Sequence, residues 1–296
     1  MRVADQQIYG TLLGNLQRSR QQILEAQQQI SSQKKVTEPS DDPAAFGQIV
    51  LDKASLSQTE QWIRNIRFGT ARVQAADNAL GQAQNLITRV RELTIQARSD
   101  TTSAQGRAVI AQEVRELHRQ LMQLANTEVE GRAIFAGTET DVTPFVIAAG
   151  DTVTYQGNSE AQAIAVGRNQ TVQVVIPGNE IFTGATTNVF NTLRDLLAAL
   201  EGNNAAGIET AIANLDLATK QFSDAQGRVG ALANRLEITQ TALDAATTTI
   251  REALSNNEDA DLAAAAAQLS LHQVAVEASA QAFRRIFETT LLKVLQ

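Results

Sequence analysis

Apolar residues recur at seven-residue intervals near both ends of the chain. The N-terminal repeat consists of Tyr9, Leu16, Ile23 and Ile30. The C-terminal repeat consists of Leu262, Leu269, Val276 and Phe283. Such a repeat keeps apolar side chains on one face of a helix that pairs with another helix. Because one narrow stripe cannot stabilise a helix by itself, we assign both stripes to an assembly interface.

The middle of the chain predicts longer helices. Apolar periodicity runs through residues 66–97, 110–124 and 189–200, and it is strongest from Ile208 to Ile250, where six heptad intervals follow one another. At a rise of about 1.5 Å per residue, a helix of some 45 residues would be roughly 65 to 70 Å long. That length exceeds the diameter of a compact domain of this size. We therefore expect a mainly α, elongated, antiparallel helical bundle.

A pattern rich in β-branched and turn-forming residues occupies residues 136–187. Residues 152–155 read as one strand, while Ile164–Val166 and Thr171–Ile176 read as a hairpin with a turn that contains glycine. We expect a small inserted β domain here. Because helical segments flank it on both sides, we also expect that excision of residues 141–183 would leave the helical bundle folded.

The helical periodicity lapses after the first helix at a motif of turn-forming residues. The motif consists of Pro39, Ser40, Asp41, Asp42 and Pro43. Proline and aspartate suit the end of one helix and the cap of the next, so the motif predicts a turn or hinge. Adjacent carboxylates could also suggest an acid–base pair, but no nucleophile or second acid is spaced to work with them.

These patterns divide the chain into three parts. We expect a terminal coiled-coil domain from residues 1–45 and 256–296, a helical rod domain from residues 46–135 and 188–255, and the β insert domain from residues 136–187. Ordering the backbone costs about 1 to 2 kcal/mol per residue, which a solvated apolar stripe does not offset. The terminal domain is therefore expected to be disordered before assembly.

The composition excludes several classes of chemistry. The 296 residues include no cysteine and two histidines, His118 and His272, so thiolate chemistry is ruled out and a metal centre is not expected. Acidic side chains outnumber basic ones, 32 to 25, which favours neither nucleic acid nor anionic lipid as a partner. The acidic run Glu258–Asp261 lacks the spacing of a calcium loop and is expected to cap a helix. We expect no enzyme activity and no cofactor.

Neither a secretory signal nor a membrane span is evident in the chain. The N-terminus turns polar at once, and no apolar run approaches the roughly 18 to 20 residues that a span requires. We therefore expect a protein that does not bind membranes and that is either soluble or exported without a cleaved signal peptide.

Several short segments resemble the bacterial flagellin family. They include Gln29–Ser32 with the Pro39–Pro43 motif, Arg91–Ala97, Leu124–Thr127 with Gly131–Gly137, Glu258–Leu262 and Glu277–Phe283. The resemblance covers both helical ends of such chains, with the β insert between them. It implies a structural subunit of the flagellum and no enzyme.

Within that family, the version of the Pro39–Pro43 motif, the short chain and the small insert look like the members that join hook to filament. The resemblance implies export of an unfolded chain through the flagellar type III apparatus to the outside of the cell, without a cleaved signal peptide. It implies four kinds of partner: a ring of like subunits, the hook-side junction protein, flagellin and an export chaperone.

Two other classes of helical protein remain as alternatives. A type III secretion tip component would also lack cysteine and a signal peptide, but it should carry either a membrane-inserting apolar segment, which is absent here, or a chaperone-linked surface. A signalling coiled coil would show heptads without a β hairpin midway along the chain. The oligomeric state separates the classes, because a stable parallel dimer would favour the signalling coiled coil.

Overall fold

A computed structural model describes residues 2–148, 151–184 and 186–294, with the side chains of residues 2–9, 12 and 286–294 left out. The helices are α1 (Arg2–Ser32), α2 (Pro43–Arg98), α3 (Ala104–Ala125), α4 (Gly178–Phe182), α5 (Val189–Glu201), α6 (Ala205–Glu258) and α7 (Leu262–Val294). The strands are β1 (Glu128–Val129), β2 (Arg132–Ala133), β3 (Phe145–Ile147), β4 (Val153–Tyr155), β5 (Ala163–Gly167) and β6 (Gln170–Gln173). A mainly α fold with long helices and small antiparallel β segments is therefore confirmed.

The chain forms two compact units. The terminal unit comprises Met1–Gln58 and Ala246–Gln296, and the central unit comprises Thr59–Ala245. Both boundaries fall inside helices, one in α2 and one in α6.

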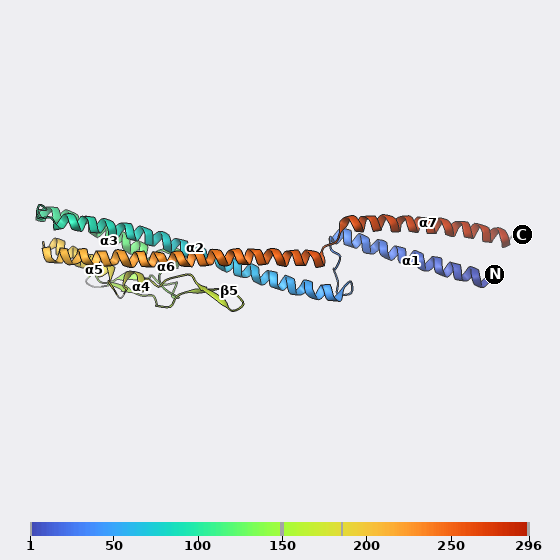
Figure 1. The fold of residues 1–296 in the computed structure, drawn as a ribbon, viewed down its shortest axis with the longest axis horizontal. Helices are drawn as coiled ribbons and strands as arrows, with labels where there is room; N and C mark the ends of the chain where they lie inside the picture. The colour runs from blue at the N-terminus through green and yellow to red at the C-terminus, as the bar shows by residue number, and fades with distance from the viewer. Residues whose placement is uncertain (1, 149–150, 185, 295–296) are drawn as a thin grey trace. The chain divides into compact units, whose positions relative to one another are not determined.

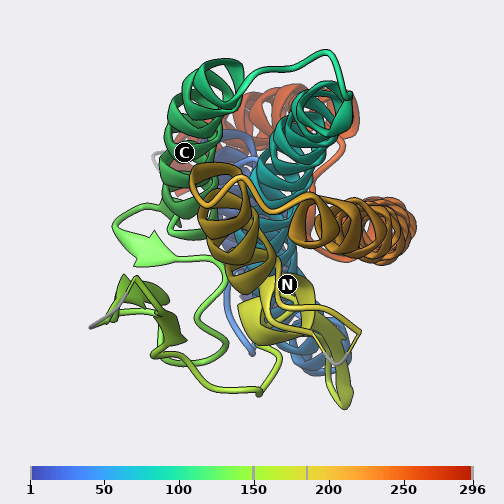
Figure 2. The same cartoon turned by 90° about the vertical axis from the view of Figure 1, so that its left-hand side faces the viewer.

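Four helical segments run side by side in the central unit: α3, α5, the part of α2 from Thr59 to Arg98 and the part of α6 from Ala205 to Ala245 (Figure 1 and Figure 2). Their heptad positions face inward, since Leu80, Ile87 and Leu215 are completely buried. Side-chain caps fix two of the helix starts. The hydroxyl oxygen of Ser103 accepts a hydrogen bond from the Gly106 amide at 3.1 Å, and Asn188 caps α5 in the same way.

Three short antiparallel hairpins lie on one side of these helices (Figure 1 and Figure 2). The predicted hairpin is present as β5 and β6, with Ile164 opposite Val172, but its second strand ends at Gln173 and not at Ile176 as predicted. The predicted strand at residues 152–155 is also present, as β4, and it pairs with β3. Neither β3 nor the β1–β2 pair was expected from the sequence.

The β segments and the helices share one hydrophobic core. Its centre is a cluster of five buried phenylalanines, whose contacting rings have centroids 5.2 to 5.8 Å apart. The members are Phe135, Phe145, Phe182, Phe190 and Phe222. Phe145 and Phe182 lie in the segment 141–183, whereas Phe190 and Phe222 belong to α5 and α6. The expectation that this segment could be excised without harm is therefore contradicted, because its removal would open the core that the helices share.

Replacing Phe145 with alanine is expected to lower the free energy of unfolding by about 3 to 5 kcal/mol, because the change removes a fully buried ring. Ile147 lies on the same strand but is 60% exposed, so Ile147→Ala is the matched control and should change stability by less than about 0.5 kcal/mol. Urea denaturation followed by circular dichroism measures both values. Equal effects of the two substitutions would mean that the β segments are peripheral to the core.

In the terminal unit, the α1–α2 connection is hydrogen-bonded to the α6–α7 connection. The Lys35 amide donates to the Glu258 carbonyl at 2.8 Å, and the Ala260 amide donates to the Gln33 carbonyl at 3.0 Å. Lys34 and Asp259 lie between these two bonds as an isolated antiparallel bridge. We call residues 33–35 and 258–260 the clasp. It joins two connections that lie more than two hundred residues apart in the sequence.

Glu258 anchors the clasp through its buried carboxylate. One oxygen, Oε1, accepts from the Lys34 ammonium at 2.5 Å and from the Lys53 ammonium at 2.8 Å, although Glu258 is only 5% exposed. Burial alone would raise the pKa of Glu258, but the hydrogen bonds and charges of Lys34 and Lys53 outweigh it and hold the pKa below its ordinary value. The ionised form is therefore the one that the folded clasp stabilises.

Glu258→Gln is expected to weaken the clasp by about 1 kcal/mol, because both lysines are nearly half exposed and water replaces part of the lost interaction. The amides of Lys35 and Ala260 should then exchange with solvent roughly fivefold faster. Hydrogen exchange of the assembled protein, in which the terminal domain is expected to be ordered, measures this change by mass spectrometry. Glu252→Gln, at an exposed position on the same helix, is the control.

Acidification should reproduce the effect of Glu258→Gln. Because the folded pKa of Glu258 lies below the ordinary value of 4.5, its contribution is complete above about pH 4.5 and is lost as the pH falls through the lowered pKa. Exchange at the clasp that does not depend on residue 258 or on acid would show that backbone hydrogen bonds alone hold it.

Candidate assembly interface of the terminal helices

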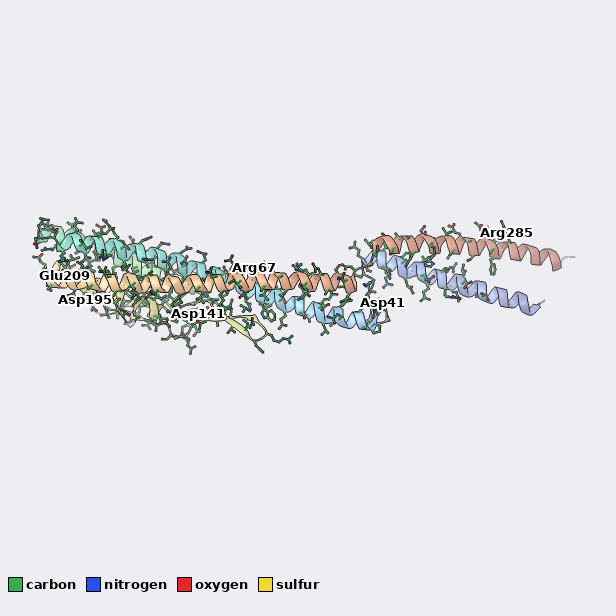
Figure 3. All side chains as sticks on the ribbon, viewed as in Figure 1. Asp41, Arg67, Asp141, Asp195, Glu209 and Arg285 are labelled. Atoms are coloured by element: carbon green, nitrogen blue, oxygen red, sulfur yellow. The ribbon has the colours of Figure 1, made fainter. Side chains whose placement is uncertain are left out.

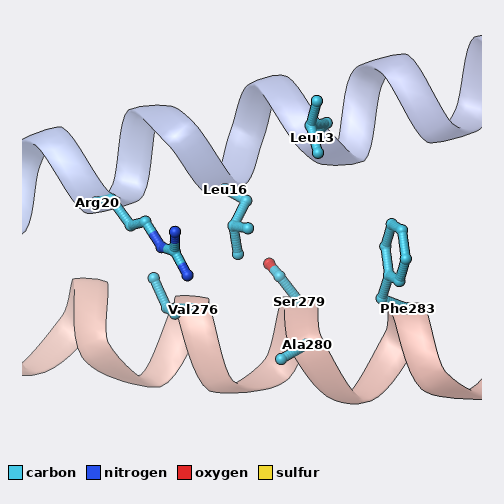
Figure 4. A pocket seen from close by; sticks show the side chains of 7 residues that line it. All are labelled: Leu13, Leu16, Arg20, Val276, Ser279, Ala280 and Phe283. Atoms are coloured by element: carbon cyan, nitrogen blue, oxygen red, sulfur yellow. The ribbon is translucent and has the colours of Figure 1, made fainter.

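Helices α1 and α7 lie side by side in the terminal unit. An apolar groove of about 340 Å³ opens between them. Its lining comprises Leu13, Leu16 and Arg20 from α1 and Val276, Ser279, Ala280 and Phe283 from α7 (Figure 4). The groove shows that the two helices approach each other without filling the space between them.

The groove brings three of the eight predicted stripe residues together: Leu16, Val276 and Phe283. Four others do not line it. Ile23, Ile30 and Leu269 are half-buried, and Leu262 is exposed at the start of α7. Tyr9 lies in α1, but its side chain is outside the described residues. The assignment of the stripes to contacts between subunits stays a prediction, because a single chain contains no such contact.

Little apolar surface is removed from water where α1 meets α7. Among the described side chains of these two helices, only Ala26 and Ala265 are buried. Burial of apolar surface stabilises by about 25 cal/mol per Å², and a methyl group supplies little of it. The larger stripe residues are only half-buried, so the pairing leaves part of their apolar surface in water and both helices keep faces available for other contacts.

The predicted turn motif forms a compact turn before α2. One carboxylate oxygen of Asp41 accepts from the Thr37 and Glu38 amides at 2.9 and 3.0 Å (Figure 3 shows Asp41 in the α1–α2 connection). Asp42 accepts from the amides of residues 44 and 45, both at 3.0 Å, and so caps α2. Pro43 follows as the first helical residue, where a missing N–H costs nothing.

All five motif residues are exposed, so the motif acts through backbone geometry and not through burial. Pro39 and Ser40 occupy the turn itself, where the Asp41 amide donates to the Glu38 carbonyl at 3.1 Å. The backbone hydrogen bonds from Glu38 and Thr37 lower the pKa of Asp41, because they favour the ionised carboxylate. The arrangement is that of a turn and a helix cap, as the sequence predicts, and no acid–base pair is formed.

The acidic run Glu258–Asp261 contains residues with two different structural roles. Asp261 caps α7, since its Oδ1 accepts from the amides of Ala263 and Ala264, both at 3.0 Å. Glu258, in contrast, ends α6 and binds lysines in the clasp. The prediction of a helix cap is therefore right for Asp261 and wrong for Glu258. No local pattern could reveal this, because Lys34 and Lys53 lie more than two hundred residues away along the chain.

The two histidines lie apart from the groove between α1 and α7. His118 is in the central unit with its ring 6.0 Å from that of Phe190, and burial lowers its pKa while Asp151 partly opposes the shift. His272 is half-buried on α7. Within the described parts of the chain, no three His, Cys, Asp or Glu side chains are grouped as metal ligands would be.

No helix in residues 2–294 is both long and apolar enough to cross a membrane. Helices α2 and α6 are more than twice as long as a membrane span requires, but polar side chains along both helices make them too hydrophilic to cross a bilayer.

Two segments of the chain match the models of one protein family. Residues 3–140 match the bacterial flagellin N-terminal helical region, and residues 212–295 match the bacterial flagellin C-terminal helical region. The two matches cover the helical halves of the chain and leave most of the β segments and α5 between them. The segments that carry the resemblance in the sequence lie inside these two regions.

Individual relatives agree with the family match. The chain is 28% identical to flagellar hook-associated protein 3 of Escherichia coli over 96% of each chain, and 31% identical to that of Salmonella typhimurium over 69% of each. The crystal structure of flagellar hook-associated protein 3 from Legionella pneumophila has the same fold, with a TM-score of 0.64 at 17% identity over 70% of this chain and 98% of that one. The chain therefore belongs to the bacterial flagellin family, a family of structural proteins and not of enzymes.

Proposed function

We propose that this chain is a structural subunit of the bacterial flagellum that joins the hook to the filament. The observation that supports this function best is the similarity to hook-associated protein 3 of Escherichia coli along almost the full length of both chains. Because this relative is named for the hook and is similar to the chain along almost its whole length, the similarity favours a junction subunit over a type III secretion tip component.

The terminal helices carry the proposed assembly. Among their described side chains only two alanines are fully buried, so neighbouring subunits would supply further burial that stabilises them. We expect residues 1–45 and 256–296 to be disordered in the free subunit and to fold as copies form a ring. The hook-side junction protein would pack against one end of that ring and flagellin against the other.

The proposed location is outside the cell, at the hook–filament junction. The subunit would travel there unfolded, without a cleaved signal peptide, and an export chaperone would cover the apolar stripes on the way. A disordered terminal segment suits this route, because less structure has to be unfolded before export.

A carboxylate on the C-terminal stripe is expected to block incorporation. Leu269→Asp or Phe283→Asp would bury an unpaired charge on assembly, at a cost of at least several kcal/mol. A strain that lacks its own copy of the gene should then export the variant but show hooks without filaments and fail to swim. Gln281→Asp adds the same charge at an exposed position of α7 that lies away from the stripe, and it is the matched control.

Electron microscopy, immunoblotting of the culture medium and motility assays measure these outcomes together. The proposed function would be contradicted if the strain without any copy of the gene still made filaments and swam. The proposed role of the stripe would be contradicted if the Leu269→Asp subunit were incorporated as well as the Gln281→Asp control.

A further inference from the structure

The central unit contains a cavity to which the proposed function gives no role. The cavity has a volume of about 320 Å³ and lies between α3, α5 and the hairpin of β3 and β4. Helix α3 contributes Arg115, His118 and Arg119 to its lining, and α5 contributes Arg194 and Leu197. Cavities of a few hundred cubic ångströms are large enough to hold a small molecule.

Positive charge is in excess among the described residues that line this cavity. The three arginines bring three guanidinium groups, whereas Asp151 and Glu201 bring two carboxylates. His118 adds no charge near neutral pH, because burial lowers its pKa and Asp151 opposes this shift only in part. The lining therefore carries one uncompensated positive charge, although the chain as a whole is acidic.

The arginines of α3 keep N–H groups available for a ligand. Arg119 uses Nη1 to bond both carboxylate oxygens of Glu116, at 2.7 and 2.8 Å. Arg115 uses Nη2 to bond Glu201. A guanidinium group has five N–H donors and no acceptor, so both side chains can donate further hydrogen bonds. A ligand that completes these bonds has to supply acceptor oxygens, and a carboxylate supplies two of them.

Another part of the lining is apolar. Ile147 on β3 is 60% exposed, and Leu197 and Ala198 on α5 line the same cavity. Covering such wet apolar surface with the apolar part of a ligand is favourable. At about 30 Å³ for a water-sized group, a cavity of about 320 Å³ holds roughly ten non-hydrogen atoms. The space therefore suits a small molecule and not a folded segment of a partner protein.

We infer that this cavity binds a small organic monocarboxylate with a short apolar chain. Its carboxylate accepts hydrogen bonds from Arg119 and Arg194 and neutralises the excess positive charge, while its apolar chain covers Ile147 and Leu197. A dianion is a poorer ligand, because Asp151 would repel its second charge. This site goes beyond the proposed function, since it lies in the central unit and involves neither terminal helix.

NMR of the full chain tests the site, because the chain has only two histidines and His118 lines the cavity. Isovalerate is the probe, and the variant His272→Gln identifies the His118 signals. Isovalerate should shift the imidazole signals of His118 to saturation with a Kd of about 1 mM and leave those of His272 unchanged. Isovaleramide has the same shape without the charge, and acetate lacks the apolar chain, so each should bind at least about tenfold more weakly.

A variant of α3 tests the role of the arginines. Arg119→Gln should weaken isovalerate binding about tenfold, because it removes a charged donor from the cavity. The Arg119 side chain is 61% exposed and glutamine is a good helix former, so the fold should be unaffected. Arg89→Gln is the matched control, since Arg89 is also an exposed, ion-paired arginine of the central unit but does not line the cavity. It should leave the affinity unchanged.

The inference is overturned if isovalerate up to about 50 mM leaves the His118 signals unchanged. It is also overturned if isovaleramide or acetate binds as tightly as isovalerate, or if the Arg119→Gln variant binds isovalerate as tightly as the Arg89→Gln variant. Each of these results would leave the proposed function intact, because that function depends on incorporation of the subunit into flagella and not on this cavity.

Discussion

The uneven burial of apolar side chains is the constraint on which the rest of this structure depends. In the central unit, phenylalanines from the β segments, α5 and α6 meet in one cluster, and heptad residues such as Leu80 and Leu215 are completely buried. Among the described side chains of α1 and α7, burial is limited to Ala26 and Ala265. The central unit therefore holds its own fold, whereas the terminal helices need surface from other molecules.

Helix caps and the clasp hold the connections next to the terminal helices in place without burying much apolar surface. Asp42 and Asp261 cap α2 and α7, so the starts of both helices are defined by hydrogen bonds from backbone amides. The clasp joins the two connections through backbone hydrogen bonds and the buried carboxylate of Glu258. Because these interactions are local and directional, they can set where each helix begins while the faces of α1 and α7 remain free for neighbouring subunits.

Local periodicity in the sequence predicted most of the helices and the main hairpin. Contacts between residues far apart in the sequence could not be predicted in this way. The heptads from Ile208 to Ile250 lie in one helix, and the β5–β6 hairpin follows from its β-branched runs and glycine turn. The pairing of Glu258 with Lys34 and Lys53 could not be read from the sequence, because it depends on how distant connections meet. The same holds for Arg72, a completely buried side chain that donates to the Ala133 carbonyl at 3.0 Å. At the candidate interface, the stripe through Val276 was visible as a heptad, whereas its partial burial beside α1 could not be read from the sequence.

Hydrogen exchange of the same chain, free and incorporated into flagella, tests most directly whether the terminal helices fold through assembly. We expect amides of α1 and α7 to exchange within seconds in the free subunit and to become protected in the flagellum, while amides of the central unit are protected in both. Equal protection of α1 and α7 in the two states would contradict it, because the pair would then be stable without its neighbours.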